Sequence, residues 1–211
     1  MKYKLIIFDF DGTIADTSLG IIDSHKYALA AMGKSIPQDE MLRKVIGGNL
    51  LKTYIETFGF QEDDARKAVG IYRKRYAENG IHKATVYSGF EELLKELKSC
   101  GYKIGVATLK AEKFAKVMLK ELNIDRYFDI VSGMDENDTL DKAGLLLRCC
   151  ECCNIDVDDA VLIGDSINDL NGANQAGVNF IGVTYGFGFK PDEKYEFISI
   201  DYPKQLLAIL K

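Results

Sequence analysis

Short apolar runs alternate with longer amphipathic stretches along most of the chain. Each apolar run is rich in Ile, Val or Phe and lacks a sustained two-residue alternation, which is typical of a strand buried on both faces of a parallel sheet. The predicted strands are residues 4–10, 102–108, 128–132, 160–164 and 180–184. The predicted helices that separate and follow them are residues 88–100, 111–123, 142–153, 169–176 and 203–210. Strands that alternate with helices predict a doubly wound α/β sheet.

Residues 17–81 interrupt this alternation. Four helical stretches and no convincing strand occur there, at residues 18–32, 38–46, 50–58 and 63–79. A segment of about 65 residues is much longer than an ordinary crossover connection. We therefore expect a Rossmann-like core domain formed by residues 1–16 and 82–211, with an α-helical cap domain inserted at residues 17–81.

The composition excludes several classes of protein. The 211 residues are 47% apolar, enough for one sizeable core or a core with a small accessory domain. The net charge is -5 and no basic patch dominates, so the electrostatic footprint of a nucleic-acid-binding protein is missing. No apolar run approaches the roughly 18 residues of a membrane span, and the N-terminal run breaks at Asp9, too early for a signal peptide. We expect a cytoplasmic protein that binds neither nucleic acid nor membrane.

Four of the five cysteines form one tract: Cys149, Cys150, Cys152 and Cys153. Its two C-x-x-C pairs suit zinc or redox chemistry. On a helix, however, the four thiols fan around the axis and cannot all reach one tetrahedral ion, and the two histidines are far away in sequence. We interpret the tract as small apolar residues on a half-buried helix.

Polar side chains stand where the predicted strands end, and ligands bind at the carboxyl ends of strands in open α/β sheets. In chain order they are Asp9, Asp11, Thr108, Lys142, Asp165 and Asp169. Taken alone, each has a simpler explanation: Asp169 as a helix cap, Thr108 as an ordinary strand end, Lys142 as a solvated lysine. Their joint order along the chain is what predicts a site.

The charges of these residues indicate the chemistry. Asp9 and Asp11 share a side if the backbone stays extended, and two such carboxylates need a cation or a shared proton. Asp165 and Asp169 add negative charge at the same edge, and acidic clusters with only oxygen ligands suit Mg²⁺. Lys142 opens a helix, where it opposes the helix dipole by about 0.3–1 kcal/mol, and such a locally unfavourable choice points to function. An ammonium, a hydroxyl and a metal around one carboxylate make a site for a tetrahedral anion.

The segments DFDGT, VAT, DK and GDSIND, in this order, resemble the four motifs of the haloacid dehalogenase-like (HAD) superfamily. The helical insert resembles the cap of its phosphoglycolate phosphatase-like branch, as does the stretch GVTYGFG, so that the resemblance covers essentially the whole chain. It implies a phosphoric monoester hydrolase that uses Mg²⁺ and acts on a small phosphorylated metabolite. We expect a monomer or a homodimer.

The resemblance also implies a role for each residue. Asp9 is the nucleophile that takes the phosphoryl group as an aspartyl phosphate. Asp11 protonates the leaving oxygen and then activates the water that hydrolyses the intermediate. Thr108 and Lys142 hold the phosphoryl oxygens.

The implied metal site is built from the same acidic residues. Asp165 binds Mg²⁺ together with Asp9 and the backbone carbonyl of Asp11, and Asp169 supports the site directly or through water. Many relatives carry Gly-x-Pro-Leu in the cap, where this chain has Gly-Gly-Asn-Leu at residues 47–50. Because the cap usually sets substrate choice, phosphoglycolate, a nucleoside 5′-monophosphate, a sugar phosphate and pyrophosphate all remain candidates.

Two alternatives share the same residues. A phosphomutase of the β-phosphoglucomutase type would return the phosphoryl group to a sugar phosphate instead of to water. A non-catalytic protein on the same fold would bind a phosphorylated ligand without turnover, since a fold alone does not give activity.

Overall fold

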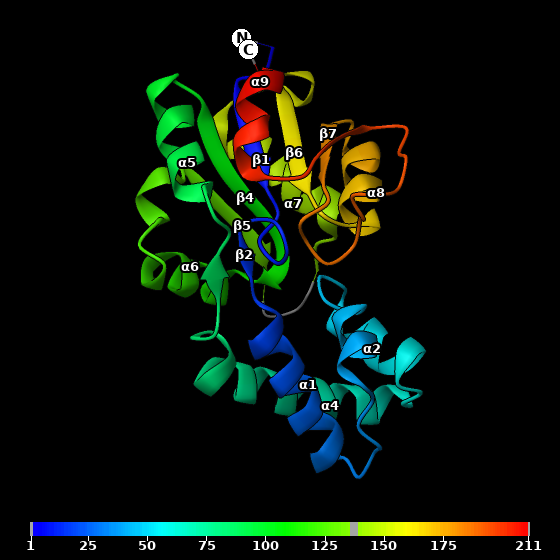
Figure 1. Ribbon diagram of the computed structural model, residues 1–211. Helices are drawn as coiled ribbons and strands as arrows, with labels where there is room; N and C mark the ends of the chain where they lie inside the picture. The colour runs from blue at the N-terminus through cyan, green and yellow to red at the C-terminus, as the bar shows by residue number, and fades with distance from the viewer. Residues whose placement is uncertain (1, 136–138, 211) are drawn as a thin grey trace. The chain divides into compact units, whose positions relative to one another are not determined.

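The computed structural model describes residues 2–135 and 139–210 (Figure 1). The chain divides into two compact units. The core unit comprises Met1–Asp16 and Thr85–Lys211, and the helical unit comprises Thr17–Ala84. A short antiparallel ribbon of β2 (Ala15–Asp16) and β3 (Thr85–Val86) stands where the chain leaves the core unit and returns to it.

Six strands in the described part of the core unit form one parallel sheet, in the order β5-β4-β1-β6-β7-β8 (Figure 1). They are β1 (Leu5–Phe8), β4 (Lys103–Ala111), β5 (Ile130–Met134), β6 (Ala160–Gly164), β7 (Asn179–Val183) and β8 (Ile198–Ile200). The central strand β1 is buried throughout and pairs with residues 103–106 of β4 and residues 160–163 of β6. The parallel strands predicted from the apolar runs are confirmed, and β1 and β6 are buried along their whole length.

Helices connect the strands of the core unit. They are α5 (Phe90–Ser99), α6 (Glu112–Glu121), α7 (Lys142–Cys153), α8 (Ile167–Ala176) and α9 (Leu206–Leu210), with 3₁₀ turns at Asp125–Tyr127, Val157–Asp159 and Pro203–Gln205. The strand order runs outward from β1 in both directions, so right-handed crossovers put α6 on one face of the sheet and α7 and α8 on the other. The doubly wound architecture is therefore confirmed, and its topological switch point lies at β1.

The helical unit contains α1 (Ser18–Ala31), α2 (Asp39–Arg43), α3 (Leu50–Lys52) and α4 (Glu62–Arg75), and π-helical turns at Thr53–Thr57 and Tyr76–Gly80 continue α3 and α4. Its residues are all described, and none of them forms a strand. His25 belongs to an aromatic core with Tyr54 and Tyr72, where burial lowers its pKa to about 4. His25 is thus a neutral core residue of this unit at neutral pH. Within the described ranges, no helix combines the length and the apolar character needed to cross a bilayer.

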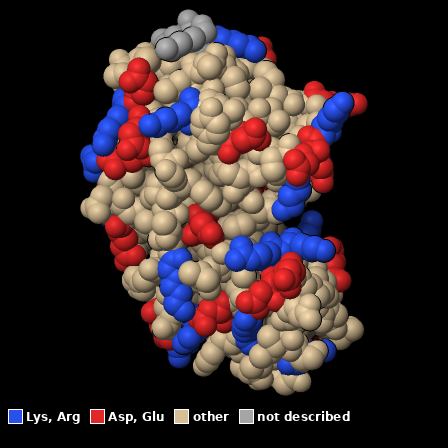
Figure 2. Space-filling view, viewed as in Figure 1, with Lys and Arg blue, Asp and Glu red and all other residues tan. Residues whose placement is uncertain are grey.

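The surface carries charges of both signs. On the face shown in Figure 2, acidic and basic side chains are interspersed instead of gathering by sign. Some form exposed ion pairs one helical turn apart, such as Arg66 with Glu62 and Lys116 with Glu112. Pairs of this kind contribute little to stability and are typical of a solvated helix face.

The structure differs from the predicted strands at β1 and at β8. β1 ends at Phe8, because the chain then turns back on itself, with the amides of Ile14 and Ala15 bonded to the carbonyl of Phe10 and with Gly12 at φ +86°. β8 was not predicted. It has only three residues, of which two are exposed, so the apolar pattern that marks the inner strands is missing there.

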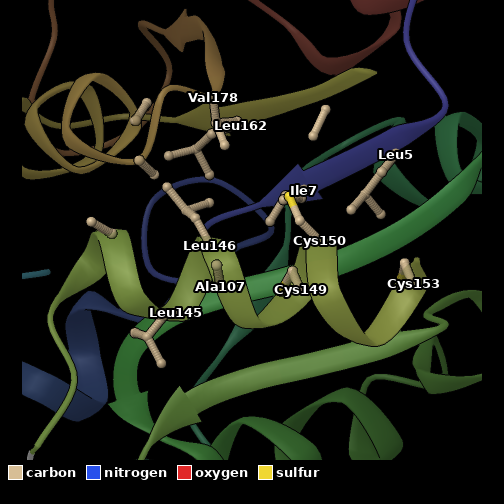
Figure 3. Close-up of a cluster of buried hydrophobic side chains, with 14 of the residues drawn as sticks. Leu5, Ile7, Ala107, Leu145, Leu146, Cys149, Cys150, Cys153, Leu162 and Val178 are labelled. Atoms are coloured by element: carbon tan, nitrogen blue, oxygen red, sulfur yellow. The ribbon is translucent and has the colours of Figure 1, made fainter. Parts of the chain in front are cut away.

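The cysteine tract lies on α7, against the sheet (Figure 3). Cys149, Cys150 and Cys153 are buried in an apolar cluster that includes Leu5 of β1, whereas Cys152 is exposed. All five cysteines of the chain are described and free. Burial raises the pKa of Cys149 to about 12 and that of Cys150 to about 11, so both stay protonated thiols at neutral pH. The interpretation of the tract as core packing is confirmed.

Replacing Cys149 with alanine should therefore cost stability and nothing else. We expect Cys149→Ala to lower the free energy of unfolding by about 1 kcal/mol, since it leaves a small cavity under the sheet. The exposed Cys152→Ala, one helical turn away, should change it by less than about 0.5 kcal/mol. Urea denaturation measures both. Stoichiometric zinc in the purified protein that disappears in Cys149→Ala would show that the tract binds metal instead.

Candidate active site

Three neighbouring strands, β4, β1 and β6, place polar groups at their carboxyl ends, on one side of the sheet. Asp9 follows β1, and its N–H still donates to the carbonyl of Ile163 at 2.9 Å, which fixes its backbone to the sheet. Thr108 lies in the carboxyl-terminal part of β4, and Asp165 follows β6. All three side chains are buried. These ends lie at the switch point of the sheet, where ligands of open α/β folds bind.

Lys142 lies at the centre of this group. It is the first residue of α7, and its Nζ donates to Asp9 Oδ1 at 2.6 Å and to the carbonyl of Ala107 at 2.7 Å. Asp169 Oδ1 lies 2.7 Å from the same Nζ. The three N–H groups of the ammonium therefore have three acceptors. Burial lowers the pKa of Lys142, but the Asp169 and Asp9 carboxylates outweigh it and hold the pKa above its usual value.

Three carboxylates converge beside Lys142. One carboxylate oxygen from each of Asp9, Asp165 and Asp169 lies within 4.8 Å of the other two. Among the described residues, these three form a cluster that could hold a metal ion. Burial raises the pKa of Asp9 to about 7, against the opposing effect of Lys142. Burial, with the Asp169 and Asp9 charges, also raises the pKa of Asp165 well above its usual range. Buried oxygen ligands at this spacing fit a hard divalent cation such as Mg²⁺.

Asp169 also caps a helix. Its Oδ2 accepts from the backbone N–H of Ser166 at 3.1 Å and from the Ser166 hydroxyl at 2.6 Å, and the hydroxyl accepts from the N–H of Asp169 in turn. This capping box starts α8 at Ile167, two residues earlier than predicted. Asp169 can therefore cap the helix and belong to the site at once, because Oδ2 makes the capping bonds while Oδ1 faces Lys142.

The Asp11 side chain lies outside the group of three carboxylates. Its Oδ1 pairs instead with Lys110 Nζ at 3.0 Å, and the two side chains are only 7% and 5% exposed. Lys110 was not among the predicted site residues. β4 runs on to Ala111 through a bulge between Thr108 and Ala111, and bulges re-aim side chains in this way. The Lys110 N–H also donates to Thr108 Oγ1 at 3.2 Å.

The comparisons with known proteins agree with this geometry. A family model described as haloacid dehalogenase-like hydrolase matches residues 6–183. The chain belongs to this family. A 5′-nucleotidase of Pseudomonas aeruginosa is 36% identical to this HAD chain over 89% of it and 86% of the relative. A phosphoglycolate phosphatase of Psychrobacter arcticus is 30% identical over 91% of the chain and 88% of the relative.

The solved structures agree as well. A predicted phosphatase from Clostridium acetobutylicum superposes with a TM-score of 0.92 at 33% identity, covering 100% of this chain and 99% of that one. This HAD protein is accordingly an enzyme, a phosphatase of the HAD type.

Proposed function

We propose that this HAD phosphatase hydrolyses a small phosphate monoester with Mg²⁺ and through an aspartyl phosphate on Asp9. The observation that carries the proposal is the buried Asp9 carboxylate at the switch point of the sheet, 2.6 Å from the Lys142 ammonium and within the group of three carboxylates. The names of the two relatives, a 5′-nucleotidase and a phosphoglycolate phosphatase, support a small metabolite as substrate.

The chemistry proceeds in two steps. In the first, a carboxylate oxygen of Asp9 attacks phosphorus, the ester P–O bond breaks, and the leaving oxygen takes a proton from Asp11. In the second, Asp11 takes a proton from water, the water oxygen attacks phosphorus, and inorganic phosphate leaves while the Asp9 carboxylate is restored. Splitting one difficult hydrolysis into two displacements is the advantage of a carboxylate nucleophile.

The two lysines and Thr108 position these groups. With its three N–H groups directed at Asp9, Asp169 and Ala107, Lys142 orients the nucleophile and must exchange one partner to reach a phosphoryl oxygen. Lys110 pairs with Asp11 at 3.0 Å, so Asp11 must take up a proton and leave this ion pair before it acts as the acid. The Thr108 hydroxyl is the donor to the phosphoryl oxygens.

The metal completes the charge balance. Asp9, Asp165 and Asp169, with the backbone carbonyl of Asp11, would hold Mg²⁺, which offsets negative charge on the phosphoryl oxygens when bound. None of these residues distinguishes one ester from another, since they serve the phosphoryl group alone. We assign that selection to the cap formed by the helical unit, a role that lids have in other enzymes.

A phosphate-release screen tests the proposal. The panel contains phosphoglycolate, nucleoside 5′-monophosphates, sugar phosphates and pyrophosphate, each with Mg²⁺ and with EDTA. We expect release from at least one monoester that EDTA abolishes and excess Mg²⁺ restores. Isomerisation of a sugar phosphate that needs a bisphosphate activator and releases no phosphate would favour the mutase. No turnover over the whole panel would favour a non-catalytic protein.

A further inference from the structure

The segment formed by residues 185–189 holds Asp165 through its backbone. The N–H of Phe187 donates to Asp165 Oδ2 at 2.6 Å, and the N–H of Gly188 lies 3.3 Å from the same oxygen. The next N–H, of Phe189, donates to the main-chain carbonyl of Asp165 at 2.9 Å. Three successive backbone amides therefore fix both the side chain and the main chain of Asp165. Hydrogen bonds to a charged acceptor such as a carboxylate are among the stronger ones.

The backbone of this segment can come so close to Asp165 only because glycines stand at the points of contact. A Cβ on Gly186 would lie 2.4 Å from the Cβ of Asp165 and 2.4 Å from the carbonyl oxygen of Gly12, and a Cβ on Gly188 would lie 2.4 Å from the carbonyl oxygen of Asp165. In the turn after β1, a Cβ on Gly12 would lie 2.2 Å from Asp165 Oδ2. Glycines from two separate segments thus surround Asp165, and a methyl group at any of them would displace it.

Contacts at both ends hold the segment in place. The Tyr185 hydroxyl donates to the carbonyl of Thr13 at 3.1 Å, and its ring packs edge-on against Tyr87. At the other end, the Phe189 ring packs against Phe197 and lies 8% exposed. The amides that face Asp165 are therefore presented by a segment that is anchored before and after them.

We propose that residues 185–189 are a backbone clamp that positions Asp165 for the metal ion. The clamp binds Oδ2, so the plane of the carboxylate is set and its second oxygen is left for the cation. Groups that orient a metal ligand from behind commonly change metal affinity by about tenfold to a hundredfold. The inference rests on the proposed Mg²⁺ site, and it adds a segment far along the chain that none of the acidic motifs contains.

Calorimetric titration with Mg²⁺ alone tests the clamp. Gly186→Ala should bind Mg²⁺ at least about tenfold more weakly than the unmodified protein. Its phosphatase activity should keep rising with added Mg²⁺ over a range in which the unmodified enzyme is already saturated. The matched control is Gly70→Ala within α4, where a Cβ meets nothing within 4 Å, and its Mg²⁺ affinity should be unchanged.

A second variant keeps the test decisive if Gly186→Ala does not fold. Tyr185→Phe removes only the hydroxyl that bonds to Thr13, and it should weaken Mg²⁺ binding in the same direction by a smaller factor. If the unmodified protein does not bind Mg²⁺, the proposed function fails. If it binds Mg²⁺ and the folded variants bind it equally tightly, the clamp is wrong and the proposed function stands.

Discussion

Asp9→Asn should lower kcat by about a thousandfold or more while the fold stays intact. The amide keeps the size and shape of the carboxyl group, but it cannot attack phosphorus as a carboxylate does. Phosphate release measures the loss, and circular dichroism with urea denaturation checks the fold. A well-folded Asp9→Asn protein that retains more than a few per cent of the activity would remove Asp9 from the role of nucleophile.

Asp11→Asn is the matched control, since it makes the same chemical change two residues away. It should also be severely impaired, because the leaving oxygen lacks its acid and the water lacks its base. With an aryl phosphate, however, the leaving group needs little protonation, so phosphorylated protein should still form. The two variants therefore differ in which step fails, and equal behaviour towards an aryl phosphate would contradict the separate roles.

Lys142→Met should damage both activity and stability. Its ammonium is buried among two carboxylates and a carbonyl, and removing one partner of a buried ion pair costs about 3–5 kcal/mol. We expect kcat to fall by about a hundredfold or more as well, since Asp9 loses its orienting charge. Urea denaturation in EDTA and phosphate release in Mg²⁺ separate the two effects.

An exposed lysine supplies the control for that variant. Lys116 forms a surface pair with Glu112 one helical turn away, so Lys116→Met should change the free energy of unfolding by less than about 0.5 kcal/mol. Lys142→Arg keeps the charge but not the geometry of three separate donors, and it should recover only part of the loss. If Lys142→Met matched Lys116→Met in both assays, the central position given to Lys142 would be incorrect.

The sheet was predictable because its inner strands are short and mostly apolar, as expected of parallel strands covered on both faces. That pattern, with the rule that ligands bind at the carboxyl ends of strands, predicts from the sequence alone that Asp9, Thr108 and Asp165 lie together. β8 was not predicted, because an edge strand of three residues with an exposed Ile198 lacks this apolar pattern.

Features that depend on pairing between distant segments were not predictable from the pattern. Lys110 reaches Asp11 through a bulge that exists only when β4 is paired with β5. A lysine two residues beyond Thr108, on the same side of an extended chain, was the signal that could have marked it. The signal of the backbone clamp in the sequence is the pair of glycines on either side of Phe187. Glycines alone do not indicate which residue they approach.

Trapping the phosphorylated protein tests directly whether Asp9 carries the phosphoryl group. The unmodified and Asp11→Asn proteins are mixed with an aryl phosphate and Mg²⁺, quenched, and reduced with borohydride, which converts an acyl phosphate into homoserine. We predict homoserine at position 9 in peptides analysed by mass spectrometry, more in Asp11→Asn than in the unmodified protein and none without substrate. Homoserine at another aspartate, or full phosphate release with no modified residue at position 9, would contradict a reaction through Asp9.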